Sequence, residues 1–409
     1  MFKIIFSRRM LVSFIMGFAC GLPLLLTSTV LQAWMKDSGV DLTVIGLMAL
    51  VGLPYTLKFL WAPFFDRFTL SLGRRRGWLM VAQVSLVFAI AGLGFTDPAL
   101  NPAVMVFSAL LVTFFSASQD IVVDAYRRED LADEELGLGS SFYINGYRVG
   151  MLLASGGGLI LADYLSFTMV YLIMAACMLP GIITTLLTPE PMVSGGTPKT
   201  LREAIVEPLA EYFSRENALL ILAFVLLYKL GDTMASAITT PFYLDIGFSK
   251  TEIGAVVKLF GFWATLAGSL TGGLMMLRIG INRSLWIFGF LQAISTAGFA
   301  ILARIGHSLP ALSGVIAFEN LTAGMGTAAY AAFMASLTNR KFTATQYALL
   351  SSLMGVPRVL ASAPTGFLAK YMGWERFFIF CVVIALPGMM LLLKFAPWAP
   401  KNKKSIKIA

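Results

Sequence analysis

The stretch TFFSASQDIVVDAYRREDL, residues 113–131, carries two carboxylates at the end of a long apolar run and then becomes densely charged. Asp120 and Asp124 are four residues apart, so on a helix they share one face at a separation of about 6 Å. The run begins near Asn101, and a carboxylate this far inside it costs several kcal/mol if it faces lipid. Both aspartates are therefore predicted to face a cavity or a partner and to have a functional role. For Asp124 an alternative stays open, an ion pair with Arg127 at the membrane surface that only caps the helix.

The composition places the chain in a membrane. Of its 409 residues, 58% are hydrophobic and 13% are charged, which leaves too little polar surface to cover a water-soluble core. Apolar runs of about 20 residues, the length that a helix needs to cross a hydrocarbon core, repeat from end to end. The sequence therefore predicts an all-α integral membrane protein.

The apolar runs predict twelve spans. Lys and Arg residues accumulate in the loops on one side, which the positive-inside rule identifies as cytoplasmic and which also holds both termini. A polar linker at 189–217 separates an N-terminal bundle (1–188) from a C-terminal bundle (218–396), and a basic cytoplasmic tail follows at 397–409. Residues 200–213 of the linker are expected to form an amphipathic helix at the inner membrane surface. The predicted spans are about 10–34, 43–65, 78–95, 102–125, 138–162, 168–187, 218–245, 251–277, 284–303, 309–337, 344–369 and 375–395.

The two halves repeat each other at an offset of about 207 to 210 residues. Two six-helix repeats with a cytoplasmic linker describe the twelve-helix major facilitator fold, built from two pseudo-symmetric six-helix bundles with a site between them. Small residues at helical spacing, such as Gly17 with Gly21 and Gly268 with Gly272, predict close packing of the spans. The recurring residues are Gly73 and Gly280, Arg76 and Arg283, Trp78 and Trp286, and Arg148-Val149 and Arg358-Val359.

Further ionisable residues fall inside the apolar runs. Lys229 and Asp232 are three residues apart on the seventh span, and they either neutralise each other or contact a solute. Glu319 on the tenth span has no charged neighbour in the sequence and needs a partner, a proton or a cavity. Separating a carboxylate from a cation lets it take up a proton, so we predict proton coupling at Asp120, Asp124, Glu319 and Asp232.

Polar and aromatic residues along the predicted path form a candidate substrate site. Amide, hydroxyl and aromatic groups together with several cations suit a polar, anionic organic solute that includes sugar rings. Arg148 lies at the depth of Asp120 on the neighbouring span and is its expected partner. For each residue alone, a hydrogen bond between helices is an alternative to substrate contact. The predicted substrate-binding residues are Gln32, Lys58, Gln119, Tyr143, Asn145, Arg148, Tyr228, Lys229, Lys258, Asn320, Gln346 and Arg358.

Other classes of protein have little support. The three cysteines lie in separate apolar runs without paired spacing, which argues against disulfide, metal or redox chemistry. No Gly-rich phosphate loop and no nucleophile with a base in register occur, so we expect no enzyme, cofactor, metal site or ATPase subunit. The net charge of +9 is divided among short loops, which topology explains better than nucleic acid does. We expect a monomer in the lipid bilayer whose partners are a small solute and protons.

Several stretches resemble the AmpG muropeptide permeases. Among them are LVGLPYTLKFLWAPFFDRF from Leu50, SASQDIVVDAYRRED from Ser116 and FENLTAGMGTAAYAAFM from Phe318, and the similarity runs from the first span to the eleventh. The resemblance implies proton-driven import of anhydro-muropeptides, which are cell-wall turnover products, across the bacterial inner membrane. It also implies a role in peptidoglycan recycling and in the signalling that leads to β-lactam resistance.

The resemblance assigns roles to particular residues. The family's acidic fourth-span motif falls on Gln119, Asp120 and Asp124, and its seventh-span motif falls on Lys229 and Asp232. Better-known members carry two additional C-terminal spans, whereas twelve spans are predicted here. Shorter relatives import siderophores and related ones carry acetyl-coenzyme A, so an importer of a siderophore or of another polar anionic solute such as an acyl-coenzyme A is the alternative. A membrane-embedded enzyme or lipid-binding scaffold is the alternative from another class.

Overall fold

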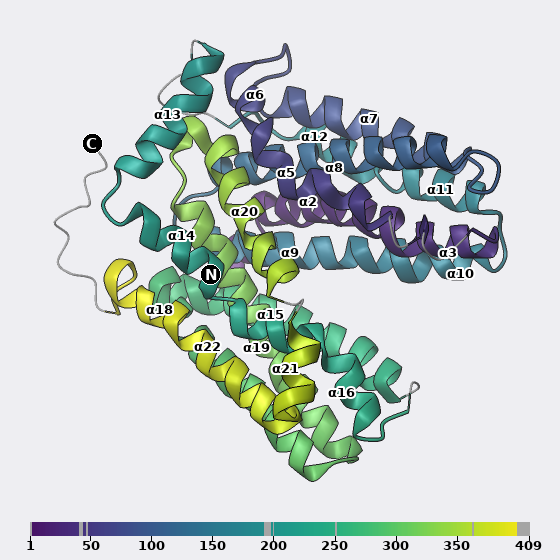
Figure 1. Cartoon of the computed structure of the whole chain (residues 1–409). Helices are drawn as coiled ribbons and strands as arrows, with labels where there is room; N and C mark the ends of the chain where they lie inside the picture. Colours follow the sequence, from purple (N-terminus) through teal and green to yellow (C-terminus); the bar gives the residue numbers. More distant parts are fainter. Residues whose placement is uncertain are drawn as a thin grey trace. The chain divides into compact units, whose positions relative to one another are not determined.

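The computed structural model describes residues 2–40, 44–45, 48–191, 198, 200–249, 252–361 and 364–398. Within these ranges the chain is almost wholly helical, and helical residues lie in all twelve predicted spans (Figure 1). Seven helical runs of the described chain have the length and apolar character to cross a membrane. The other spans are divided into shorter helices.

Proline and π-helical turns account for the divided spans of the first half. Pro54, Pro63 and Pro180 each stand in the first turn of a short helix, where the missing N–H costs no hydrogen bond. The elements are α1 (Phe2–Ile5), α2 (Arg8–Leu25), η1 (Leu26–Val30), α3 (Leu31–Asp37), η2 (Met48–Gly52), α5 (Leu53–Leu57), η3 (Lys58–Leu60), α6 (Ala62–Arg67), α7 (Arg76–Gly94), α8 (Pro102–Asp130), α9 (Leu136–Leu152), η4 (Leu153–Gly157), α10 (Gly158–Ala162), α11 (Phe167–Ala176) and α12 (Leu179–Leu187).

One bend in the second half confirms the expected boundary between the eighth and ninth spans. Gly280 has φ 78° and ψ 165° inside an otherwise continuous helix, a conformation that a residue with a Cβ rarely adopts. The elements are α13 (Leu201–Ser214), α14 (Ala218–Leu227), α15 (Leu230–Ala237), α16 (Thr239–Asp245), η5 (Ile253–Phe260), α18 (Gly261–Ile305), α19 (Leu309–Ser336), η6 (Arg340–Phe342), α20 (Thr343–Leu360), α21 (Thr365–Met372) and α22 (Trp374–Phe395).

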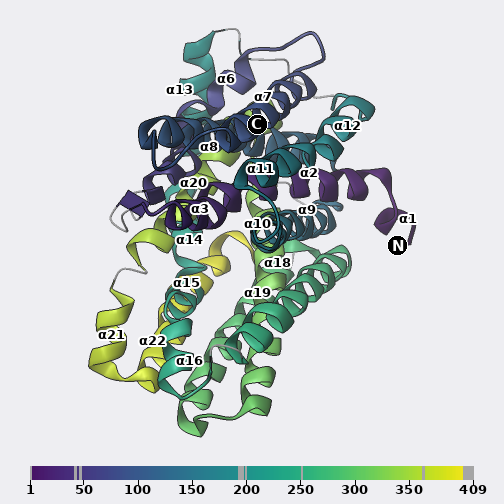
Figure 2. The same ribbon diagram turned by 90° about the vertical axis from the view of Figure 1, so that its right-hand side faces the viewer.

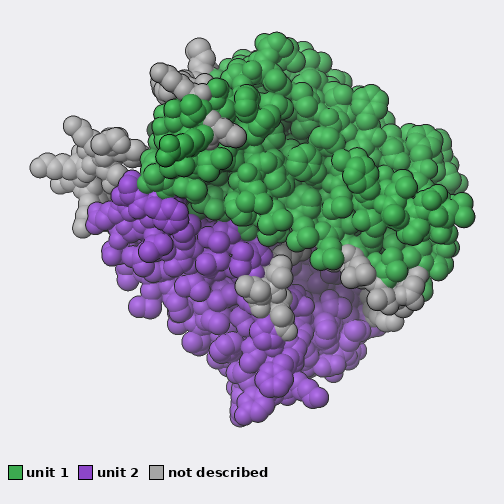
Figure 3. Space-filling model, turned by 45° about the horizontal axis from the view of Figure 1, so that its top comes forward, with its two compact units in different colours: residues 1–211, 335–352 green, residues 212–334, 353–409 purple. Residues whose placement is uncertain are grey.

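The chain forms two compact units (Figure 3). Unit 1 contains residues 1–211 and 335–352, and unit 2 contains residues 212–334 and 353–409. The start of α20 thus packs with the first half of the chain, while the same helix continues into unit 2. Helix α13 lies in the predicted linker, and residues 399–409 of the predicted basic tail lie outside the described residues.

Glycine allows very close packing of α2 on α9 in unit 1, and the two helices lie side by side in Figures 1 and 2. A Cβ on Gly17 would lie 2.1 Å from the carbonyl oxygen of Tyr143, and one on Gly21 would lie 2.0 Å from that of Tyr147. In unit 2, a Cβ on Gly268 would lie 2.0 Å from the carbonyl oxygen of Leu321. The close packing predicted from these small residues is therefore confirmed.

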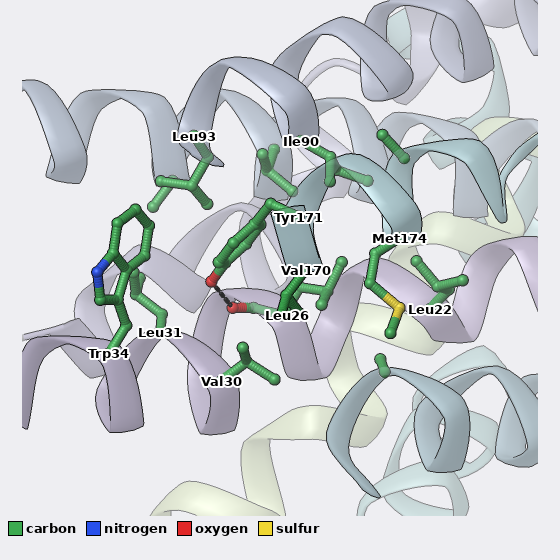
Figure 4. Close-up of a cluster of buried hydrophobic side chains, with 14 of the residues drawn as sticks. Leu22, Leu26, Val30, Leu31, Trp34, Ile90, Leu93, Val170, Tyr171 and Met174 are labelled. Atoms are coloured by element: carbon green, nitrogen blue, oxygen red, sulfur yellow. Dashed lines mark hydrogen bonds between the residues drawn. The ribbon is translucent and has the colours of Figure 1, made fainter. Parts of the chain in front are cut away.

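An apolar core joins the first and sixth spans of unit 1 (Figure 4). Tyr171 is wholly buried and donates a 2.8 Å hydrogen bond from its hydroxyl to the carbonyl oxygen of Leu26. Trp34 stacks on Phe167 with ring centroids 5.4 Å apart. The one phenol among the buried residues of this core is therefore satisfied, whereas several buried polar atoms of α8 have no partner in the described chain.

Candidate functional site

A buried polar cluster in unit 1 surrounds the two aspartates of α8. Asp120 is 7% exposed and Asp124 is 5% exposed, and both lie on a helix that continues without a break from Pro102 to Asp130. Because the helix is continuous, the carboxylates are held one turn apart on the same face. Neighbouring groups come from α2, α5, η3 and α9, and from the start of α20.

Asp124 forms a buried ion pair with Arg127, whose Nη2 lies 3.1 Å from its Oδ1. The guanidinium also donates to the hydroxyls of Ser140 at 2.7 Å and Tyr347 at 3.0 Å, and lies 4.5 Å from the ring centroid of Tyr143. The pairing considered as an alternative is therefore present, but Arg127 is only 3% exposed rather than at a surface. The pair ties α8 to α9 and α20, which a simple helix cap does not do.

Asp120 has a different environment. Its Oδ1 has no hydrogen-bond partner among the described residues. The cation that acts on it is Lys58 of η3, rather than the predicted Arg148, and Lys58 also acts on Asp124. The thiol of Cys20, interpreted from the sequence as a small apolar group, lies beside this carboxylate. Asp120 thus lacks the arginine that neutralises Asp124.

Two amide side chains of unit 1, those of Gln119 and Asn145, have buried polar atoms without a partner in the described chain. Gln119 donates from Nε2 to the sulfur of Cys20 at 3.3 Å, but its Oε1 is buried without a partner in the described chain. Both side-chain polar atoms of Asn145 are likewise buried and unpaired there. Tyr143 and Tyr147 of α9 lie beside the two aspartates, with ring centroids 6.1 Å apart, whereas Asn145, two residues from each, lies on another face of the helix. Buried polar atoms without a protein partner mark places where water or a polar solute binds.

A second acidic cluster lies inside unit 2. Lys229 and Asp232 form the predicted ion pair, with Nζ 3.0 Å from Oδ2. Glu319 is 8% exposed and lies beside Asp232, a neighbour that its position in the sequence does not indicate. Its Oε2 accepts a hydrogen bond from Ser295, whose hydroxyl accepts one from Thr322 at 2.9 Å. The cluster therefore combines two carboxyl groups with one ammonium group.

Three predicted substrate contacts form the interhelical hydrogen bonds of the alternative interpretation. Tyr228 donates to the carbonyl oxygen of Leu285 at 2.8 Å. Asn320 accepts from Thr265 at 2.8 Å. Gln346 instead joins α20 to α13, donating to the carbonyl oxygen of Pro208 at 3.1 Å and to the carboxylate of Glu211.

The remaining predicted residues are exposed, half-buried or outside the described side chains. Gln32 on α3 and Lys258 on η5 are exposed, and Arg148 on α9 is half-buried. The side chain of Arg358 lies outside the described residues.

A third charged cluster, around Arg75, holds the start of α20 in unit 1. Arg75 is fully buried, and its Nη2 lies 2.7 Å from Oδ1 of Asp66 and 2.6 Å from Oε1 of Glu129. Asp66 also caps α20: its Oδ2 accepts from the backbone N–H of Thr345 at 2.9 Å and from the Thr345 hydroxyl at 2.7 Å. This explains why residues 335–352 belong to unit 1.

The two arginines of this cluster differ electrostatically. Burial opposes the charge of Arg75, but the carboxylates of Glu129 and Asp66 raise the pKa of its guanidinium above the ordinary value. Burial and the neighbouring charge of Arg75 lower the pKa of Arg74, despite a 2.9 Å contact with Glu129. In the sequence this cluster is indicated by the Asp-Arg pair at 66–67 and the Gly-Arg-Arg-Arg run at 73–76, which resemble the general facilitator loop between the second and third spans, with a wider gap.

Comparison with known proteins defines the class of this protein. The family model of the Major Facilitator Superfamily matches residues 10–243 and 225–408, so the chain belongs to this superfamily of membrane transporters. Among solved structures it is similar to the proton:xylose symporter XylE, with a TM-score of 0.72 at 12% identity over 95% of both chains. It is also similar to the human organic anion transporter MFSD10, with a TM-score of 0.68 at 17% identity, covering 94% of this chain and 99% of that one. The predicted fold is thereby confirmed.

Comparison with related sequences identifies the family within this superfamily to which the chain belongs. The anhydromuropeptide permease of Escherichia coli (strain K12) is 45% identical over 394 residues, which is 96% of this chain and 80% of that protein. An uncharacterised protein of Haemophilus influenzae is 42% identical over 417 residues, covering 99% and 98%. The putative transporter AmpG 1 of Rickettsia conorii is 33% identical over 408 residues, covering 95% and 98%. The chain belongs to the AmpG family of permeases, as its resemblance predicted.

Proposed function

We propose that this protein imports anhydro-muropeptides across the bacterial inner membrane and that a proton gradient drives the import. The 45% identity to the Escherichia coli anhydromuropeptide permease over nearly the whole chain is the observation that carries the substrate class. The distribution of Lys and Arg supports an orientation with both termini in the cytoplasm. Membership of a superfamily of transporters favours this function over an enzyme or a lipid-binding scaffold.

The two aspartates of α8 are proposed to carry the proton. A carboxylate removed from water is costly unless a cation, a donor or a proton neutralises it. Lys58 interacts electrostatically with Asp120, but Oδ1 of this carboxylate has no hydrogen-bond partner among the described residues. A proton bound at this oxygen would remove the buried charge. Asp124 is already paired with Arg127 and is protonated when that pair is disturbed. In unit 2, Asp232 and Glu319 are proposed to share a second proton while Lys229 balances the remaining charge.

The polar cluster of unit 1 has groups suited to an amino-sugar disaccharide with a short peptide. The rings of Tyr143 and Tyr147 offer faces for sugar stacking. The unpaired Oε1 of Gln119 offers an acceptor for hydroxyl groups and amide N–H groups, and Asn145 offers a donor and an acceptor on another face of α9. Lys58 offers a cation for a peptide carboxylate. We propose these residues rather than Tyr228, Asn320 and Gln346, whose polar groups form interhelical hydrogen bonds.

The test is uptake of labelled disaccharide anhydro-muropeptide by vesicles with an inward proton gradient, and again after an uncoupler has collapsed it. We expect accumulation that the uncoupler abolishes. Asp120→Asn and Asp124→Asn should reduce gradient-driven uptake about tenfold or more while changing equilibrium binding much less. Asp97→Asn changes an exposed aspartate of the same unit and serves as the matched control.

Two outcomes would count against this function. Full coupling in both aspartate variants would remove the proton role from α8. No uptake by folded protein under either condition would redirect the assay to ferric siderophores and acyl-coenzyme A.

A further inference from the structure

Arg127 connects the carboxylate of Asp124 to the first half of α20. The same Nη2 atom donates to Oδ1 of Asp124 at 3.1 Å and to the hydroxyl of Tyr347 at 3.0 Å. Tyr347 is 4% exposed, and its ring centroid lies 5.8 Å from the guanidinium carbon. Position 347 is 220 residues from Arg127 in the sequence, so this contact depends on how α20 is seated in unit 1.

The other groups around Asp124 do not make this connection. Asp120 lies one turn away on α8, Lys58 faces the carboxylate from η3, and Tyr143 faces it from α9. Cys20 of α2 and Tyr147 of α9 interact electrostatically with both carboxylates, and more strongly with that of Asp120. Among the hydrogen bonds of the described chain, those of Arg127 alone join Asp124 to α20.

The guanidinium is stable in this position only while Asp124 is charged. Arg127 is 3% exposed, its Nε is buried without a partner in the described chain, and Asp124 is the one described carboxylate that pairs with it. Protonation of Asp124 would leave a buried guanidinium held only by neutral hydroxyls, and an unpaired buried charge is strongly destabilising. The charge regains hydration if the segment that covers it, the start of α20, moves away.

We propose that Arg127 and Tyr347 are positioning residues that transmit the protonation of Asp124 to α20. With Asp124 charged, Arg127 holds Tyr347 and residues 343–352 stay packed in unit 1. Protonation loosens this hold, so that the cap formed by Asp66 on Thr345 still fixes the start of the segment while residues 346–352 are released. Because α20 continues into residues 353–360, which belong to unit 2, the release acts along one helix. The inference rests on the proposed function for the source of the proton.

Hydrogen–deuterium exchange of the full-length protein in detergent tests this directly, at about pH 5 and about pH 8, with each rate referred to unfolded protein at the same pH. In the wild type, peptides covering 346–352 should exchange roughly tenfold faster at the lower pH once this correction is made. Tyr347→Phe keeps the ring but removes the hydroxyl, so exchange should be fast at both pH values. Asp124→Asn should also be fast at both, because the asparagine cannot regain a charge.

Tyr171→Phe is the matched control, since it removes another buried phenol of unit 1 and should retain the wild-type pH response. Exchange in α11 of each variant reports whether unit 1 is still folded. A wild-type pH response in Tyr347→Phe, or in Asp124→Asn, would overturn the inference.

The exchange experiment contains no solute, so its failure is separable from failure of the proposed function. A pH-dependent release of 346–352 without muropeptide uptake would overturn the proposed substrate and leave this inference standing. Coupled uptake with exchange that does not respond to pH would overturn this inference and leave the proposed function standing.

Discussion

Gly21→Ala tests how far the candidate site depends on the approach of α2 to α9. The added Cβ would lie 2.0 Å from the carbonyl oxygen of Tyr147 and 2.9 Å from its Cα. Restoring ordinary contact at 3.4 Å requires the two backbones to separate by about 1.4 Å, because no rotatable side chain at this point can give way. The two helices share further close contacts at Gly17, Gly146 and Gly150, so the strain cannot be relieved locally.

Overpacking of this kind costs about 3 kcal/mol, at the upper end of the usual range because backbone meets backbone. For a unit of this size, such a loss lowers the midpoint of thermal unfolding by roughly 6–12 °C. The same separation displaces Tyr143 and Tyr147, whose rings lie beside Asp120 and Asp124. We therefore expect both a lower melting temperature and weaker solute binding.

The assay is thermal unfolding of the purified protein in detergent beside Gly92→Ala. Gly92 lies in α7, and a Cβ there would meet no heavy atom within 4 Å. An alanine at that position should be neutral or stabilise by up to about 1 kcal/mol, because it removes the entropic cost of glycine in a helix. If Gly21→Ala melts no lower than Gly92→Ala, the close approach of α2 and α9 is refuted.

Two further substitutions address contacts elsewhere in the chain. Asp66→Asn removes the anion beside Arg75 and one acceptor at the start of α20, so we expect a loss of about 3 kcal/mol in the thermal unfolding of unit 1; the exposed Asp163→Asn is its control, and equal melting of the two would contradict the capping role. Ser249→Ala removes the hydroxyl that accepts from the backbone N–H of Glu252, while the bond from the backbone N–H of residue 249 to the Glu252 carboxylate remains, so the loss should be about 1 kcal/mol. An unchanged midpoint in the same measurement would show that this half of the capping box does not stabilise unit 2.

The fold was predictable because the features that define it are local. The length of an apolar run is set by the thickness of the membrane, and the offset between the halves is visible in the sequence. The bend at Gly280 is also local, since the repeat pairs it with Gly73 and both residues adopt positive φ. The division of single spans into short helices was harder to predict from the sequence. It depends on where side chains and neighbouring helices form hydrogen bonds with the backbone groups that a helix break leaves unpaired.

The candidate site was predictable only in part, because its contacts join distant positions. Helical spacing indicated the pairs Asp124 with Arg127 and Lys229 with Asp232, and both pairs are present. It could not indicate that the first pair is buried, since that depends on side chains from α9 and α20. Arg127 and Tyr347 form a hydrogen bond although they are 220 residues apart in the sequence, and no pattern in a single sequence predicts such a contact.

The repeated loops show which features serve the fold alone. In the first half, Arg76 donates to the carbonyl oxygens of Thr185 at 3.1 Å and Leu186 at 2.8 Å, at the end of the sixth span. In the second half, Arg283 donates to the carbonyl oxygen of Trp398 at 3.0 Å, just after the twelfth span. Each arginine therefore binds the end of the last helix in its own half. This contact belongs to the architecture of a six-helix repeat.

The first loop contains additional charges that the second lacks. At an offset of 207 residues, Arg74 and Arg75 correspond to Ile281 and Asn282, and Asp66 corresponds to Gly273. If these charges only stabilised a six-helix bundle, both halves would need them. They occur instead in the loop where Asp66 caps α20 and where residues 335–352 are held in unit 1. The asymmetry assigns the charged cluster to a task that the repeat does not share, which is to hold a segment of the second half against the first.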